Sequence, residues 1–388
     1  MKKFVVLLLL SSSAFGQSIF SVKDLQDIRF ENFKKSLLLE FFYTNDYLST
    51  TGGTKAGPRN IGALDLYLTS DFNKFTRWDG QLMVHYNHVS GLDSRGAIGD
   101  YQGTSNIEMP SQVDRLTDLW YQGAWNDKVK TLVGIHDLST AFNVTDSSFN
   151  FINASFGTSA EISFSGPAGA PIYPVTSVGI KNDVQFTEEL LLQAALYDAT
   201  AGDQSTWRSF HSDVGNDDGF LAITELAYET ELQKIGLGGW AYTKKLPKYL
   251  DETEEGTSAG AYTVLQHAFT PNLIGFFRYG WANPEVSAIQ SNTVVGGVYR
   301  GLLQRKNDED EIGLGVSSAK FSGNHRKELE DPTTLGGPPA ETVYEAYYQF
   351  KPLKYLQLRP DVQYVARPAG LGAVDDAWSF GFRSVIQL

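Results

Sequence analysis

Apolar residues recur at every second position through segments of about ten residues, and this period of two constrains the fold more than any other feature of the chain. In the last segment, Trp378, Phe380 and Phe382 fall on one face of an extended chain. Ser379 and Arg383 fall on the other face. Side chains alternate between the two faces of a β-strand. The pattern therefore predicts strands with one apolar and one polar face.

Sixteen such segments follow one another from Ser36 to the end of the chain, and their connections alternate between short and long. The short connections include Phe72–Phe75, Asn126–Lys128, Phe186–Glu188, Thr270–Asn272 and Pro352–Lys354. The long ones include Val89–Gln112, Asp137–Pro171, Ala201–Asp218, Lys245–Ser258, Ser322–Ala340 and Ala366–Asp376. We therefore expect an all-β fold over residues 36–388, a sixteen-stranded antiparallel transmembrane β-barrel with short periplasmic turns and long extracellular loops.

The first residues are typical of an exported protein. Met1-Lys2-Lys3 is basic, residues 4–10 are apolar, and small residues follow up to Gly16. This order predicts a signal peptide over residues 1–16 that is cleaved near Gln17. Residues 17–35 then form a short periplasmic N-terminal segment, and the expected location is the bacterial outer membrane.

Composition and motifs exclude several other functions. The chain has no cysteine and a net charge of −13, so neither thiol chemistry nor nucleic-acid binding is expected. Gly256–Gly260 matches a serine-hydrolase pattern, but it lacks the strand-to-helix turn that such a site requires. We expect no enzyme activity, catalytic residue, cofactor or metal site. A barrel enzyme with Ser258 as nucleophile is the alternative from another class, and it would need a histidine beside that serine.

A barrel of sixteen strands encloses an aqueous channel, so its polar face must line the lumen. Aromatic residues near strand ends would form the girdles at the membrane interfaces. The predicted girdle residues are Tyr43, Tyr86, Trp120, Tyr279, Trp281, Tyr344, Tyr348 and Trp378. The predicted inner wall contains Glu40, Asp65, Arg77, Asp79, Glu225, Arg278, Arg300, Glu345, Arg359, Asp361, Gln363 and Arg383.

Several strings resemble the carbohydrate-selective porin (OprB-type) family, in the family's order along nearly the whole mature chain. They include residues 98–103 (IGDYQG), 119–122 (LWYQ), 133–138 (VGIHDL) and 359–364 (RPDVQY). Two departures are the terminal Leu388, where the family has an aromatic residue, and the region of Gly52 and Gly53. The resemblance implies a sixteen-stranded barrel through which glucose and other small sugars pass passively.

The expected function is thus an outer-membrane porin for selective diffusion of small, glucose-like carbohydrates. A general or cation-preferring diffusion porin is the alternative, because the acidic balance would attract cations. Expected partners are small carbohydrate solutes, outer-membrane lipid and lipopolysaccharide, and the outer-membrane assembly machinery. The sequence is also compatible with a homo-oligomer.

The long connection over residues 137–171 carries five phenylalanines interleaved with amides and carboxylates. Exposure to water would leave much apolar area unburied, so we expect this loop to fold inward and constrict the channel. An external lid packed on its own aromatics is the alternative. The predicted constriction residues are Asp137, Phe142, Asp146 and Asn153 on the loop, with Arg77, Glu225, Arg278 and Glu345 on the wall.

Overall fold

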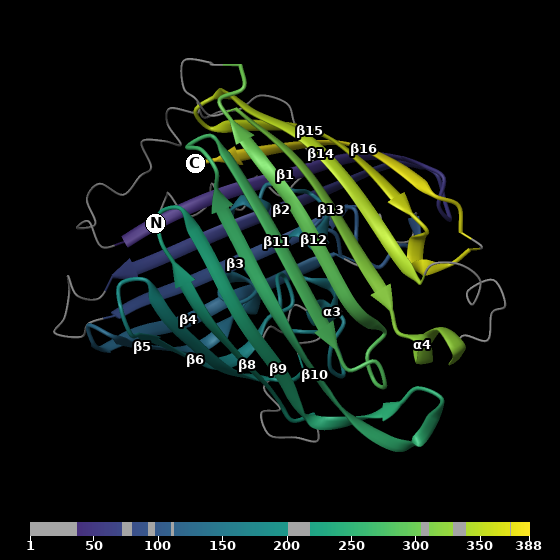
Figure 1. The fold of residues 1–388 in the computed structure, drawn as a ribbon. Coiled ribbons are helices and arrows are strands. Elements are labelled where there is room, and N and C mark those ends of the chain that lie inside the picture. The colour runs from purple at the N-terminus through teal and green to yellow at the C-terminus, as the bar shows by residue number, and fades with distance from the viewer. Residues whose placement is uncertain are drawn as a thin grey trace.

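The computed structural model describes residues 37–71, 80–91, 98–109, 112–200, 218–303, 310–328, 339–372 and 374–388, which form a closed antiparallel barrel (Figure 1). Each strand pairs with its neighbours in sequence, and β1 pairs with β16 to close the ring. The predicted sixteen-stranded barrel is confirmed. The predicted signal peptide and the 17–35 segment lie outside the described residues. Within the described ranges, no helix is long and apolar enough to span a bilayer.

The strands of the first half are β1 (Leu37–Thr51), β2 (Gly57–Asp71), β3 (Gly80–Gly91), β4 (Val113–Asn126), β5 (Val129–His136), β6 (Ser177–Gln185), β7 (Leu190–Asp198) and β8 (Phe220–Glu229). Those of the second half are β9 (Gln233–Lys248), β10 (Asp251–Ala268), β11 (Leu273–Ala282), β12 (Ile289–Arg300), β13 (Glu311–Phe321), β14 (Ala340–Leu353), β15 (Leu356–Ala366) and β16 (Ala377–Gln387). A short helix, α4 (Gly323–Glu328), follows β13.

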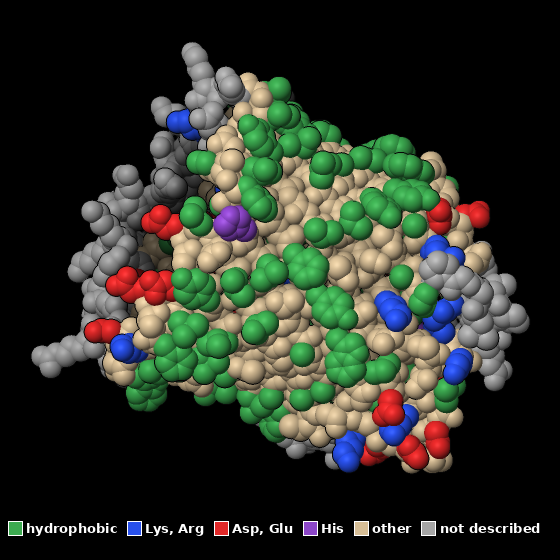
Figure 2. Space-filling model, viewed as in Figure 1, with side chains coloured by type: hydrophobic (Ala, Val, Ile, Leu, Met, Phe, Trp, Pro, Cys, Tyr) green, Lys and Arg blue, Asp and Glu red, His purple; other side chains and the backbone are tan. Residues whose placement is uncertain are grey.

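The period of two separates a lipid-facing surface from the lumen. On β16, Trp378, Phe380 and Phe382 are 47%, 54% and 43% exposed, whereas Ser379 and Arg383 are buried inside the barrel. Figure 2 shows apolar side chains spread across the strands and charged ones gathered toward the two ends. Hydrocarbon offers no hydrogen-bond partners, and the closed ladder satisfies the strand backbone.

Trp120 departs from the expected girdle. The register between β3 and β4 shifts between His85 and Tyr86, and beyond this shift Trp120 pairs with Met83. The extra residue reverses which side chains point inward. Trp120 therefore lies on the inner face, edge-on to the ring of His136 at a centroid distance of 6.4 Å.

The prediction of a long loop over residues 245–258 is wrong. β9 and β10 continue as a hairpin whose only connecting residues are Tyr249 and Leu250, and this hairpin extends beyond the other strand ends (Figure 1). The Tyr249 N–H donates to Glu285 O at 2.9 Å, and the Lys248 ammonium lies 2.9 Å from Glu254. Both faces of this hairpin are polar, so the alternation that marks lipid-facing strands is absent from its sequence.

The lipid-facing assignment predicts that a charge introduced near the middle of β12 destabilises the barrel. Val295 is 48% exposed and lies between Phe277 and Val316 on the neighbouring strands. Val295→Arg should lower the free energy of unfolding by about 2–4 kcal/mol, because the guanidinium would sit in hydrocarbon. The measurement is urea-dependent unfolding in lipid vesicles.

Ser291→Arg is the matched control on the same strand. Ser291 pairs with Trp281 and Lys320, at the edge of the apolar band. Its substitution should cost only about 0–1 kcal/mol. Equal costs at the two positions would contradict the assigned depth of β12.

Candidate functional site

The long loop, residues 137–176 between β5 and β6, is built from short helical turns. These are η3 (Leu138–Thr140), η4 (Asp146–Ser148), η5 (Ala154–Phe156) and α3 (Ala160–Ser163). The Asp137 carboxylate accepts the Ser139 N–H at 2.8 Å, and the Asn153 amide oxygen accepts the Ser155 N–H at 3.1 Å. These side-chain oxygens satisfy free N–H groups at the start of η3 and η5. Asp137 also accepts the Tyr173 N–H at 3.2 Å, which ties the two ends of the loop together.

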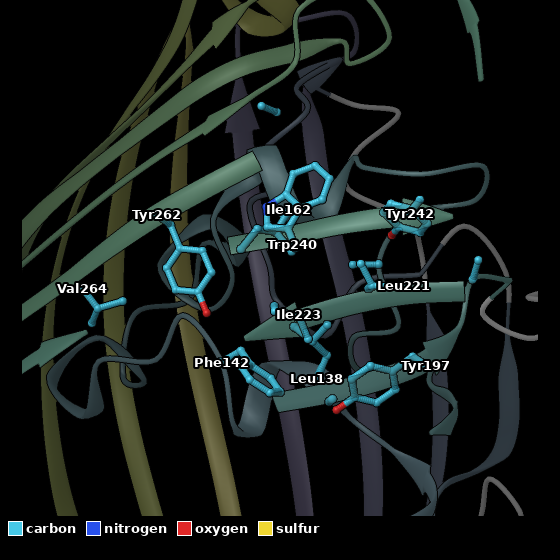
Figure 3. Close-up of a cluster of buried hydrophobic side chains, with 14 residues drawn as sticks. Leu138, Phe142, Ile162, Tyr197, Leu221, Ile223, Trp240, Tyr242, Tyr262 and Val264 are labelled. Atoms are coloured by element: carbon cyan, nitrogen blue, oxygen red, sulfur yellow. The ribbon is translucent and has the colours of Figure 1, made fainter. Parts of the chain in front are cut away.

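Apolar residues of this loop pack against the inner wall. Leu138, Phe142 and Ile162 are fully buried among wall side chains of β7, β8 and β9 (Figure 3). Full burial of a phenylalanine side chain stabilises by roughly 1.5–3 kcal/mol, so these contacts hold the loop within the barrel.

A second apolar cluster forms around Phe151 and Phe156, whose rings stack at 4.3 Å. Phe151 meets the edge of Phe276 at 5.6 Å and of Tyr347 at 4.9 Å, on β11 and β14. Gly315 leaves room for this pair, because a Cβ there would lie 2.5 Å from the Phe156 ring. Phe151 and Phe156 therefore dock against the side of the barrel formed by β11–β14.

Two buried carboxylates on the wall accept backbone N–H groups of the loop. Glu345 accepts Ile152 N–H at 2.5 Å and Asn153 N–H at 3.0 Å. Glu225 accepts Asn143 N–H at 2.9 Å. Each of these bonds gives a backbone N–H group of the loop a partner on the wall.

Arg278 supplies the complementary donor from β11. Its guanidinium is fully buried and donates to the carbonyl oxygens of Asn143, Ser155 and Phe156, each at 2.9 Å, and to Gly157 O. Irregular backbone inside a barrel leaves carbonyl groups without strand partners. Arg278 thus satisfies four of them at once.

The predicted constriction residues therefore separate by position. Asp137, Phe142, Asn153, Glu225, Arg278 and Glu345 lie at the interface between loop and wall and are 0–5% exposed. Asp146 is exposed on the surface of the loop. Arg77 lies outside the described residues.

A second segment, residues 98–109 between β3 and β4, also enters the barrel, a placement that the sequence pattern did not predict. The N–H groups of Tyr101 and Gln102 donate to the two carboxylate oxygens of Glu341, each at 2.9 Å. Gln363 donates to Thr104 O at 2.9 Å. The segment is thus held by β14 and β15 in the way the long loop is held by Glu345.

The two inward segments bind each other as well. The Ala154 N–H donates to Gly103 O at 3.0 Å, and the Asn106 N–H donates to Ile152 O at 2.8 Å. Arg383 donates to the Asn106 amide oxygen at 2.7 Å and pairs with Asp46 across the β1–β16 seam at 2.6 Å. The polar run Asp100–Asn106, which overlaps the family-like string at residues 98–103, was the signal that could have indicated this role.

His85 connects the wall to the base of the long loop. Its two ring nitrogens lie 2.8 Å from Asp65 and 3.0 Å from Asp118, and the ring stacks on Tyr67 at 3.9 Å. Asp118 also accepts the Asp137 N–H at 3.1 Å. Burial, and then the negative charge of Asp118, raise the pKa of Asp137 to about 6.

Ser258, the hypothetical nucleophile, lies within β10 and is fully buried. Its hydroxyl oxygen accepts the Gly166 N–H of the long loop at 3.1 Å. In the structure this serine is one more wall group that holds the loop.

Burial of Glu161 predicts that docking of the long loop depends on pH. This carboxyl lies against Gly280, where a Cβ would come within 1.7 Å of it. Burial raises the pKa of Glu161 from 4.5 to about 8. Because the docked loop favours the protonated form, docking should be strongest below pH 4.5 and weaken as the pH rises to about 8.

Hydrogen exchange at the amides of residues 158–165, corrected for intrinsic rates, measures this effect. Protection should fall between pH 4.5 and 8 in the wild type, and Glu161→Gln should flatten the profile. Asp146→Asn, an exposed carboxylate of the same loop, is the control and should keep the wild-type slope. An unchanged slope in Glu161→Gln would show that another group is responsible.

The chain matches known porins along most of its length. Putative porin QuiX of Acinetobacter baylyi is 24% identical, over 83% of this chain and 82% of the relative. Porin B of Pseudomonas aeruginosa is 22% identical, over 70% of this chain and 68% of the relative.

Solved structures share the fold. The high-pH structure of Pseudomonas putida OprB superposes with a TM-score of 0.86 at 20% identity, covering 97% of this chain and all of that one. The outer-membrane channel DcaP of Acinetobacter baumannii has a TM-score of 0.57 at 12% identity, covering 91% of this chain and 97% of that one. The sequence profile of the carbohydrate-selective porin, OprB family matches residues 55–388. This chain, an outer-membrane porin with a sixteen-stranded barrel, belongs to the carbohydrate-selective porin, OprB family.

Proposed function

We propose that this porin conducts small neutral carbohydrates such as glucose by passive diffusion, and that the long loop forms the constriction that selects them by size. The observation that carries the proposal is the attachment of this loop to the inner wall at several strands between β8 and β14. Its backbone or side chains bond to Glu225 on β8, Gln266 on β10, Arg278 on β11 and Glu345 on β14. A loop held at so many points reduces the free cross-section of the channel.

The loop residues left exposed suit a sugar. Phe149 is 53% exposed and Asp146 is also exposed, three positions apart on the loop. An aromatic face can pack on the C–H groups of a sugar ring while a nearby carboxylate accepts its hydroxyl protons. We assign solute contact to Asp146 and Phe149, and a positioning role to Asp137, Phe142, Asn153, Glu225, Arg278 and Glu345.

A general or cation-preferring porin is the second candidate. The net charge of −13 favours it, because fixed negative charge along a pore raises the local concentration of cations. The two candidates differ in their response to neutral solutes. A sugar-selective channel should show ion-current block by glucose, whereas a cation channel should show a reversal potential near that of potassium and no block.

Deleting Thr145–Gly157 should widen the channel. This deletion removes η4, η5 and the two N–H groups that bind Glu345. We expect a higher single-channel conductance and weaker discrimination between monosaccharides and oligosaccharides, measured in planar bilayers and by liposome permeation. Unchanged conductance and size discrimination in a correctly folded deletion variant would contradict the constriction.

Phe149→Ala is the matched control, because it removes an exposed ring and leaves the contacts between loop and wall in place. It should fold and conduct ions like the wild type but bind glucose more weakly. An effect of this variant on conductance as large as that of the deletion would argue against the division of roles.

A further inference from the structure

A polar cavity of about 320 Å³ lies between the long loop and the end of the barrel that carries the short turns, called the turn side below. Four strands form it, where β12 and β14 end and where β13 and β15 begin. Its lining residues are Asn150, Arg300, Asp310, Glu311, Gln349, Lys351 and Gln357. In porin barrels the turn side faces the periplasm, so this cavity lies at the exit of the channel.

Glu311 organises one side of the cavity. Its buried carboxylate accepts the Arg300 Nε–H at 2.8 Å, the Asn150 amide at 2.7 Å and the Tyr347 hydroxyl at 2.5 Å. Three donors on one carboxylate fix its position and satisfy most of its hydrogen-bonding capacity. Among the described residues the Arg300 side chain is bound through Nε, and it is still 48% exposed.

The opposite side is held through Gln349. Its amide oxygen accepts the Gln357 amide at 2.8 Å and the Arg359 Nε–H at 3.0 Å. Arg359 also donates to the Asn150 amide oxygen at 2.9 Å, which joins this wall to the long loop. The cavity is therefore a preorganised site whose walls come from strands and whose roof is a loop residue.

The groups that face the cavity combine donors and acceptors. Arg300 and Lys351 are exposed cationic donors. The buried Asp310 carboxylate accepts Leu303 N–H at 2.8 Å through one oxygen, and its other oxygen has no partner among the described residues. The carboxylates of Asp310 and Glu311 would repel an anion, and the positive charges of Arg300 and Lys351 would repel a cation. A neutral polyol fits both, because each hydroxyl donates and accepts.

We propose that this cavity is a binding site for one neutral monosaccharide ring at the periplasmic exit of the channel. The inference rests on the proposed passage of small sugars and adds a second site, separate from the constriction residues. The volume is near the lower end of the roughly 300–1,000 Å³ found for small-molecule sites, which suits a single ring. Glucose that arrives from the turn side reaches this site without passing the long loop.

The test is the block of ion current by D-glucose, titrated separately on each side of uniformly inserted channels. The wild type should show a lower half-blocking concentration for glucose on the turn side than on the loop side. Lys351→Met and Arg300→Gln should each raise the turn-side value about five-fold, since each removes a hydrogen bond to the solute. Loop-side values should change less.

Lys354→Met is the matched control for Lys351→Met. Lys354 is exposed at the same mouth of the barrel but does not line the cavity, so its removal changes the same charge without touching the site. Glucose block should be unchanged in this variant. Glucuronate at neutral pH tests the charge preference, and block stronger than that of glucose would overturn the assignment of a neutral ring.

The outcomes separate this site from the proposed function. Failure of glucose to enter liposomes would remove the proposed function itself. If glucose enters but blocks equally from both sides, or if Lys351→Met and Lys354→Met behave alike, the exit site is wrong and sugar passage stands. Retained heat-modifiable migration on gels verifies that each variant has a folded barrel.

Discussion

Backbone hydrogen bonding is the constraint on which the rest of this structure depends. Inside hydrocarbon, the strand N–H and C=O groups find partners only in neighbouring strands, so the sheet must close. The seam between β1 and β16 closes it, and the ion pair of Asp46 with Arg383 lies on the inner side of that seam. Closure leaves a lumen whose polar wall can bind whatever enters it.

The same constraint explains how two irregular segments stay inside the lumen. Their backbone groups have no strand partners, and buried wall side chains supply them. Glu341 serves the 98–109 segment, and Glu345 and Arg278 serve the long loop. Much of the charge on the inner wall is thus engaged in holding the loops. The groups that can meet a solute are fewer, and among them are Asp146 and Phe149 on the loop and Arg300 at the exit.

The alternation in the sequence was sufficient to predict the barrel, because every lipid-facing strand must carry it. The alternation gave wrong predictions for segments that do not face lipid and for a strand whose register shifts. The tips of β9 and β10 have two polar faces, so they carry no such period. A register shift ahead of Trp120 reverses the parity, and nothing in the local sequence marks it. The 98–109 segment binds Glu341 and Gln363, which are more than 200 positions away. The phenylalanines of residues 137–171 did indicate that the long loop packs against other parts of the protein, because apolar side chains that do not face lipid are buried away from water.

The central claim is that the long loop is bound within the lumen by the inner wall. It can be tested by cross-linking, because the chain has no cysteine of its own. The Ser147 hydroxyl donates to the Gln266 amide oxygen on β10 at 2.8 Å, so Ser147→Cys with Gln266→Cys places two thiols within reach of a short bis-methanethiosulfonate linker. The account predicts efficient cross-linking in intact membranes with single-channel conductance close to that of the uncross-linked protein. Two accessible thiols that fail to cross-link, or a cross-link that sharply lowers conductance, would contradict it.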